Sequence, residues 1–143
     1  MNFDWIYSDE NLDWNELSNL YEIAPLGIKD PNDLKISFSN SMFKCFVYHS
    51  GRLVAAGRAL ADGKDCSYIC DVAVHPDYQG QGLGSEVVSR LVGFSKNHTK
   101  IILYTSPGNE PFYQKLGFRR MKTALAIFKD QDRAMEIGLV DDA

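Results

Sequence analysis

The chain has 143 residues, of which 45% are hydrophobic and 24% are charged, and its net charge at pH 7 is −4. This length predicts one domain over residues 1–143 with a sizeable core, and the acidic balance argues against nucleic acid as a partner, since nucleic-acid binding needs a basic face. No apolar run reaches the ~18 residues of a membrane span, so no membrane partner is expected. The odd number of cysteines, three, favours a reduced protein of cytoplasmic location over a disulfide-bonded one.

Two helices are predicted in the N-terminal part of the chain. The first begins after Asp13, a typical N-cap residue, and ends before Pro25, with apolar side chains at helical spacing between them. The second begins after Asp30, which is followed by Pro31 at the first helical position. Both patterns predict helices with one apolar face.

Three antiparallel strands are predicted next. Residues 43–49 and 52–60 are joined by Ser50-Gly51, a two-residue hairpin signal. Asp62-Gly63 then turns the chain into a third strand over residues 66–74. The three segments therefore predict a β-meander.

The remaining elements alternate between helix and strand. They are predicted as a helix over residues 83–94, a strand over 101–104, a short helix over 109–116 that ends at Gly117, and strands over 124–128 and 135–139. A crossover helix between two strands implies that they pair in parallel. The order of elements predicts an α/β (α+β) domain with a mixed sheet.

The turn after the third strand carries glycine at alternate positions, Gly80, Gly82 and Gly84, and leads directly into a helix. Such a turn exposes several backbone N–H groups beside the positive end of the helix dipole, where a phosphate group binds well. The spacing matches neither the Rossmann fingerprint nor the P-loop. The sequence therefore predicts an anion site of another kind.

The flanking residues resemble a known family. Val72-Ala73-Val74-His75-Pro76, followed by a Gln-x-x-Gly-x-Gly core from residue 79 and a helix, resembles motif A of the GNAT superfamily of acyl-CoA-dependent N-acyltransferases. Residues 109–118, with the pattern Phe-Tyr-x-x-x-Gly-Phe, resemble its motif B. The resemblance implies a GNAT-like mixed, mostly antiparallel sheet with a central splayed parallel pair, flanked by about four helices.

The resemblance also implies a function. An acetyl group would pass from acetyl-CoA, the co-substrate, to a primary amine of a small molecule, by direct attack in a ternary complex. Segments around residues 24–27 and 124–128 resemble a subgroup of small bacterial and plastid-type enzymes that act on arylalkylamines or amino sugars. Many relatives pair as dimers, so a homodimer is a further expectation.

The acetyl-CoA site follows from the same resemblance. The pyrophosphate would lie on the backbone N–H groups of residues 80–85, and the pantetheine arm would pair with the strand over 72–74 like an added strand, beside a bulge that is typical of the family. The residues implied in acetyl-CoA binding are Val72, Ala73, Val74, Gln79, Gly80, Gln81, Gly82, Leu83, Gly84, Ser85, Asn109 and Tyr113. No metal site is expected, because Cys66 and Cys70 lack a second ligand pair.

Tyr113 is the expected general acid. In the family the tyrosine of motif B protonates the departing CoA thiolate, and the alternative for Tyr113 is a core tyrosine that anchors its helix. Asn109 lies four residues earlier on the same helical face. It is expected to cap the helix or to hydrogen-bond the pantetheine.

The general base has three candidates: Asp71, His75 or a water molecule. Asp71 is charged within an apolar strand, so it either pairs with a cation such as Arg58, or it binds the substrate ammonium or accepts its proton through water. By strand alternation Asp71 faces away from Cys70 and Val72. His75 has a suitable ordinary pKa but is expected to be a solvated turn histidine.

The acceptor pocket and the type of acceptor are less constrained. Tyr21, Leu26, Phe38 and Tyr78 are candidates for the pocket wall, although ordinary packing is the favoured explanation for each of them. Two alternative functions keep the fold. One is acetylation of a protein N-terminus or lysine, and the other is a non-catalytic acyl-CoA-binding sensor.

Overall fold

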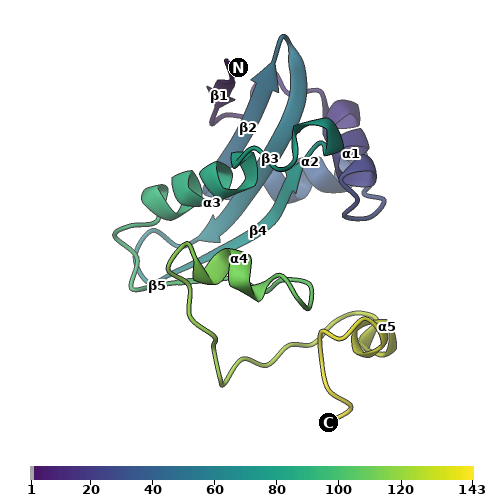
Figure 1. The fold of residues 1–143 in the computed structure, drawn as a ribbon, viewed down its shortest axis with the longest axis vertical. Coiled ribbons are helices and arrows are strands. Elements are labelled where there is room, and N and C mark those ends of the chain that lie inside the picture. Colours follow the sequence, from purple (N-terminus) through teal and green to yellow (C-terminus); the bar gives the residue numbers. More distant parts are fainter. Residues whose placement is uncertain (1) are drawn as a thin grey trace. The chain divides into compact units, whose positions relative to one another are not determined.

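The computed structural model describes residues 2–143 as two compact units, one that ends at Leu103 and one formed by Tyr104–Ala143. The first unit contains β1 (Asp4–Ile6), α1 (Trp14–Ile23), α2 (Pro31–Ser39), β2 (Phe43–His49), β3 (Arg52–Ala61), β4 (Cys66–Val74), a 3-10 helix (Pro76–Tyr78), α3 (Leu83–Phe94) and β5 (Lys100–Ile102) (Figure 1). The second unit contains α4 (Glu110–Gln114) and α5 (Gln131–Glu136).

The sheet of the first unit has the order β1-β2-β3-β4-β5. Neighbouring strands are antiparallel except β4 and β5, which are parallel. The predicted mixed, mostly antiparallel sheet and its β-meander are thus confirmed, and Ser50 and Gly51 form the predicted hairpin turn with φ values of 51° and 79°. The parallel pair lies at the end of this order, because the strands expected beyond it do not form.

Both predictions of a strand near the C-terminus, over residues 124–128 and 135–139, are wrong. Residues 124–128 have no regular secondary structure, and the side chains of Leu125 and Ile127 are 99% and 94% exposed. Met135, predicted to begin the last strand, lies in α5, which follows the N-cap Asp130. Apolar runs of five residues are too short to show a strand or helix period. The short strand β1, at Asp4–Ile6, was not predicted for the same reason.

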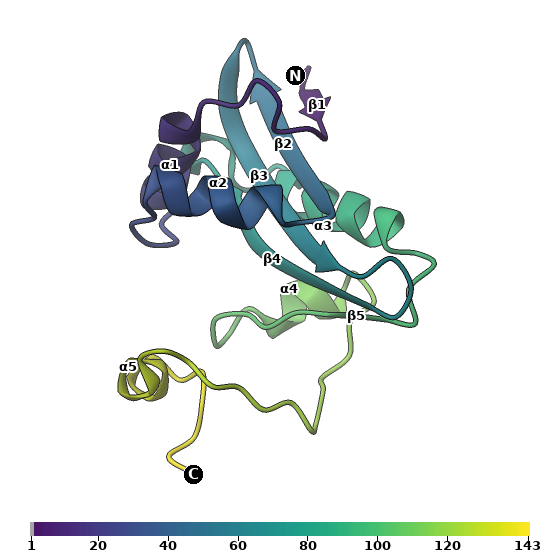
Figure 2. The ribbon, with the colours of Figure 1, turned by 180° about the vertical axis from the view of Figure 1, so that it is seen from behind.

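The helices cover both faces of the sheet, with α1 and α2 on one face and α3 on the other (Figures 1 and 2). The predicted N-caps are confirmed, since the carboxylates of Asp13 and Asp30 each accept two backbone hydrogen bonds from the first turn of α1 and α2. Such caps stabilise a helix by ~1 kcal/mol each. They fix where each of the two helices begins.

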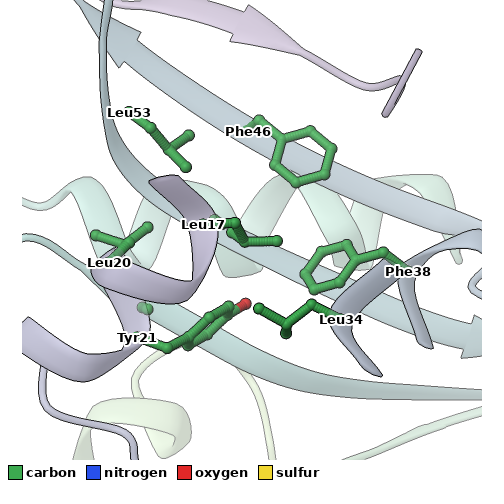
Figure 3. Close-up of a cluster of buried hydrophobic side chains, with 9 residues drawn as sticks. Leu17, Leu20, Tyr21, Leu34, Phe38, Phe46 and Leu53 are labelled. Atoms are coloured by element: carbon green, nitrogen blue, oxygen red, sulfur yellow. The ribbon is translucent and has the colours of Figure 1, made fainter. Parts of the chain in front are cut away.

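A cluster of apolar side chains lies between the α1–α2 layer and the sheet (Figure 3). Leu17, Leu20, Tyr21, Leu34 and Phe38 of the helices meet Phe46, Leu53, Ala56 and Ala73 of the sheet. Burial of each large apolar side chain contributes roughly 1.5–3 kcal/mol. The cluster therefore holds the buried Tyr21 against the sheet.

On the opposite face, α3 packs closely against β3 at Gly57. A Cβ atom at this position would lie 2.9 Å from Cγ1 of Val87 and 3.1 Å from Cδ1 of Leu91. Gly57→Ala is therefore expected to destabilise the protein by about 1–3 kcal/mol through overpacking, and thermal unfolding should show a melting temperature several degrees lower. Gly93→Ala, in α3 with nothing within 4 Å of its Cβ, is the control and should not lower it. Equal melting temperatures for the two variants would contradict this close packing.

Candidate active site

The glycine turn has the geometry expected of an anion site. Gly80 and Gly82 have φ values of 80° and 81°, a conformation that favours glycine, and no heavy atom lies within 4 Å of a Cβ built on either residue. Gly82 is also the N-cap of α3, and no side chain caps that helix. The N–H groups of the first turn, over residues 83–85, are therefore available to an anion. This arrangement fits the diphosphate of a coenzyme A.

Gln79 connects the turn to two other segments. Its side-chain Nε2 donates hydrogen bonds to the carbonyl oxygens of Val74, at 2.9 Å, and Ala24, at 3.2 Å. The side chain thus holds the start of the turn against the end of β4 and the C-cap residue of α1. Direct binding of acetyl-CoA by Gln79 stays a prediction.

Strand β4 contains a β-bulge beside this turn. One residue of β3, Gly57, faces two residues of β4, Asp71 and Val72, and the backbone of Asp71 has a left-handed φ of 56°. This is the irregularity that the family resemblance implied. Aspartate is among the non-glycine residues that tolerate this conformation best, and a bulge bends and re-aims the strand.

The bulge changes which side chains share a face. Arg58 pairs with Cys70 across the ladder and also hydrogen-bonds Asp71, so both residues of β4 lie on the α1–α2 face. Val72 lies on the α3 face, where its Cγ2 would contact a Cβ at Gly57. The prediction that Asp71 faces away from Val72 is confirmed. The prediction that it faces away from Cys70 is wrong, because the extra residue resets the alternation.

Asp71 is held by three side chains. Nε of Arg58 donates to its Oδ2 at 2.7 Å, Nζ of Lys29 lies 3.6 Å from its Oδ1, and the hydroxyl of Tyr21 donates to its carbonyl oxygen at 2.5 Å. The suggested ion pair with Arg58 is therefore present. Burial, and then the charge of Asp71, raise the pKa of Tyr21 well above its usual value, so this hydroxyl remains a donor at neutral pH.

Tyr21→Phe tests how strongly the bulge is held. The change keeps the buried ring but removes the hydrogen bond to the partly buried Asp71 carbonyl, and leaving such an acceptor unsatisfied costs about 1–3 kcal/mol. Urea unfolding should show a lower free energy of unfolding by that amount. A change below about 0.5 kcal/mol would mean that water replaces the hydroxyl or that the bond contributes little.

An open pocket of about 330 Å³ lies beside Asp71. Its wall includes the charged side chains Lys29, Asp30, Asp33, Arg58 and Asp71 and the apolar side chains Ile28 and Leu34. The pocket is thus formed by the α1–α2 connection, α2 and the sheet. Its wall combines side chains of both charges with two apolar side chains.

The four side chains proposed for the acceptor pocket do not line this one. Tyr21 and Phe38 are fully buried in the core, Tyr78 is buried and its hydroxyl lies 2.7 Å from Nδ1 of His49, and Leu26 is exposed. Ordinary packing therefore accounts for the aromatic residues. The pocket residues from the α1–α2 connection carry no motif, and only their fold brings them beside Asp71.

His75 is not the solvated turn histidine that was predicted. Its side chain is 8% exposed and caps the 3-10 helix, with Nδ1 accepting a hydrogen bond from the backbone N–H of Asp77 at 3.0 Å. Nε2 contacts the guanidinium of Arg52. Both ring nitrogens thus contact N–H groups of the protein, and His75 does not line the pocket.

The second unit contributes Tyr113 and Asn109. Burial raises the pKa of the half-buried Tyr113, while a hydrogen bond from Thr105 lowers it in part, so the phenol stays protonated at neutral pH as a general acid requires. Its ring meets those of Phe112 and Phe118 edge to face, at centroid distances of 4.9 and 6.1 Å. Asn109 is the N-cap of α4, but its side chain makes no capping hydrogen bond. Thr105 was not predicted, because it belongs to no motif.

Two kinds of feature are absent from the described part of the chain. Within residues 2–143, no group of three or more His, Cys, Asp or Glu side chains is arranged to hold a metal ion. None of the helices in the same range combines the length and the apolar character needed to cross a membrane.

Comparison with known proteins gives consistent matches. The sequence pattern of the acetyltransferase (GNAT) family matches residues 6–118. The uncharacterized N-acetyltransferase ycf52 of Pyropia yezoensis is 33% identical over 124 residues, which cover 78% of this chain and 71% of that protein. Glucosamine 6-phosphate N-acetyltransferase of Trypanosoma brucei brucei is 37% identical over 75 residues, 51% of each chain. This chain covers 63–71% of the length of the ycf52 relatives.

A solved structure shows the same fold. A protein of unknown function from meticillin-resistant Staphylococcus aureus superposes with a TM-score of 0.78 at 22% identity, covering 89% of this chain and 99% of that one. The family match spans most of the chain and contains both the glycine turn and the Tyr113 segment. The family match and the ycf52 relative, together with the glycine turn and the bulged strand beside it, show that the chain belongs to the GNAT family and is an N-acetyltransferase.

Proposed function

We propose that this protein transfers the acetyl group of acetyl-CoA to the primary amine of a small molecule. The pocket beside Asp71 is the observation that carries the proposal. A volume of about 330 Å³ lies at the small end of ligand pockets, which supports a compact acceptor over a peptide. The name of the trypanosomal relative, an enzyme for an amino sugar phosphate, is in keeping with a small acceptor.

Enzymes of this family use acetyl-CoA as co-substrate. In this protein the backbone N–H groups of residues 80–85 would bind its diphosphate, and the edge of β4 over residues 72–74 would pair with its pantetheine arm. The left-handed glycines and the uncapped start of α3 support the first contact. The second contact is supported by β5, which pairs with β4 only at residues 66–68, so that in the described part of the chain the β4 edge of residues 72–74 opposite β3 has no neighbouring strand.

The reaction is direct attack of the amine on the thioester carbonyl carbon. A backbone N–H of residues 72–74 would stabilise the oxyanion that forms. The amine proton passes to Asp71, or through water to bulk solvent, and the carbon–sulfur bond then breaks. Tyr113 protonates the departing CoA thiolate, a role that its retained proton and its motif support. The phenolate of Tyr113 then regains a proton from solvent and Asp71 releases the one it took, so that one acetyl transfer moves one proton from the amine to the thiol in total.

Two alternatives remain distinct hypotheses. A protein N-terminus or lysine as acceptor would need a groove open to a peptide. A non-catalytic acyl-CoA sensor would not need the phenol of Tyr113, which is present and protonated at neutral pH. The homodimer and the cytoplasmic location stay predictions.

A thiol-release assay separates these functions. The protein is incubated with acetyl-CoA and, in separate reactions, with 2-phenylethylamine, glucosamine 6-phosphate, 1,4-diaminobutane and peptides with a free N-terminus or lysine. Release of CoA with any small amine supports the proposal. Release with peptides alone supports a protein acetyltransferase, and tight binding of CoA without release supports the sensor.

A further inference from the structure

We propose that Lys29 occupies the place of the substrate's ammonium group at Asp71, and that the acceptor must displace it to bind. The inference rests on the proposed function, since it takes the pocket beside Asp71 as the acceptor site. It assigns to Lys29 a role in specificity. The pocket would select acceptors that carry a positive charge, because only a cation can replace the ion pair that Lys29 makes with Asp71.

The two cations at Asp71 are held very differently. The Arg58 side chain is 14% exposed, its Nε lies 2.7 Å from Oδ2, and its Nη1 donates to Oγ of Ser41 at 3.2 Å. Its guanidinium also lies 5.8 Å from the centre of the Phe38 ring. With three contacts and a rigid, permanently charged head, Arg58 is a fixed partner of Asp71.

Lys29 is the loosely held partner. Its side chain is 30% exposed, and Nζ lies 3.6 Å from Oδ1 of Asp71 and 5.6 Å from the centre of the Tyr21 ring. Its backbone carbonyl, in contrast, accepts a hydrogen bond of 2.6 Å from Oγ of Ser18. The main chain is therefore anchored while the ammonium, on a flexible stem, can leave.

The ammonium of Lys29 has the chemistry of the proposed substrate. Both are primary ammonium groups with three N–H donors, and Lys29 also lines the acceptor pocket. The carboxylates of Asp30 and Asp33 line the same pocket. An incoming ammonium restores the ion pair with Asp71, whereas an uncharged molecule of the same shape leaves Oδ1 without it.

Because the acceptor must break the ion pair between Lys29 and Asp71 to bind, the free energy of that pair is subtracted from its binding free energy. Partly exposed ion pairs of this type correspond to a factor of up to about five in affinity. Removing the charge of Lys29 while keeping most of its stem should therefore tighten the binding of an amine by about fivefold. Binding of an uncharged analogue should not change to the same extent.

The test is a titration followed by NMR with 2-phenylethylamine and 2-phenylethanol, on the wild-type protein, Lys29→Met and the control Lys35→Met. Lys35 is an exposed lysine of α2 that does not line the pocket, so its replacement changes the net charge equally. We expect Lys29→Met to bind the amine about fivefold more tightly, with the alcohol unchanged and with Lys35→Met like the wild type.

Four results would overturn the inference: unchanged or weaker amine binding in Lys29→Met, equal tightening of the alcohol, the same tightening in Lys35→Met, or no binding of the amine to any of the proteins. The thiol-release assay reports separately on the proposed function. Tighter amine binding in Lys29→Met without release from any small amine would uphold the displacement and reject the function. Release of CoA with small amines, together with identical amine binding in the wild-type protein and Lys29→Met, would uphold the function and reject the displacement.

Discussion

Tyr113→Phe is expected to lower kcat by about 10²- to 10⁴-fold, the usual contribution of a positioned general acid, and to leave the Kd of acetyl-CoA within about twofold. The substitution keeps the aromatic ring that meets Phe112 and Phe118 and removes only the hydroxyl. Steady-state kinetics with the best small amine, together with calorimetric titration of acetyl-CoA, measure the two quantities. Equal losses in turnover and in affinity would contradict the acid role.

The pH dependence gives a second readout for the same residue. An acid must be protonated to act, and burial raises the pKa of Tyr113 above its usual value. Activity that depends on this proton should therefore persist through neutral pH and decline only in strongly alkaline solution. In Tyr113→Phe this alkaline decline in kcat should disappear. Tyr104→Phe, a change at another tyrosine of the same unit, should retain both kcat and the alkaline decline.

Gly82→Val is expected to weaken the binding of acetyl-CoA by at least about tenfold. Gly82 has a φ of 81°, so a β-branched residue there is strained, and it precedes the N–H groups of residues 83–85 that would bind the diphosphate. Losing one hydrogen bond to a charged group costs about 1.5–3 kcal/mol, which is tenfold or more in affinity. Calorimetric titration of acetyl-CoA measures the change.

Backbone strain must be separated from loss of the ligand contact. Gly51, in the β2–β3 hairpin, has nearly the same φ, 79°, and likewise has no heavy atom within 4 Å of a built Cβ. Gly51→Val should therefore destabilise the protein to a similar extent, by roughly 1–2 kcal/mol, with no effect on the Kd of acetyl-CoA. If both variants bind acetyl-CoA as the wild type does, the glycine turn does not bind the diphosphate.

Much of the first unit was predictable because its signals are local. N-caps at Asp13 and Asp30, the Ser50-Gly51 hairpin and the glycine turn each depend on a few adjacent residues with distinct backbone preferences. The strands between these signals then follow from where the turns lie. The C-terminal strands over 124–128 and 135–139 lacked such signals, and both predictions were wrong.

The pocket proposed for the acceptor was not predictable by the same means. Lys29 belongs to a connection without periodicity, and its contact with Asp71 bridges 42 positions of the chain, from 29 to 71. The burial of His75 depends on Arg52 and on a cap that forms only in the folded structure. Single-sequence patterns describe neighbours along the chain, whereas this pocket is made by side chains that tertiary packing brings together.

The bulge gives β4 one residue more than its pairing with β3 needs. Ala56 pairs with Ala73 and Arg58 with Cys70, so a chain that lacked residue 71 would let Val72 pair directly with Gly57 in an uninterrupted ladder. Every other side chain of β4 would keep its present face, with Val72 still toward α3 and Ala73 still toward α1. Asp71 is therefore the extra residue of the β3–β4 ladder, and deleting it would keep the pairing of the other residues while removing the ion-pair partner of Arg58 and the proposed chemistry.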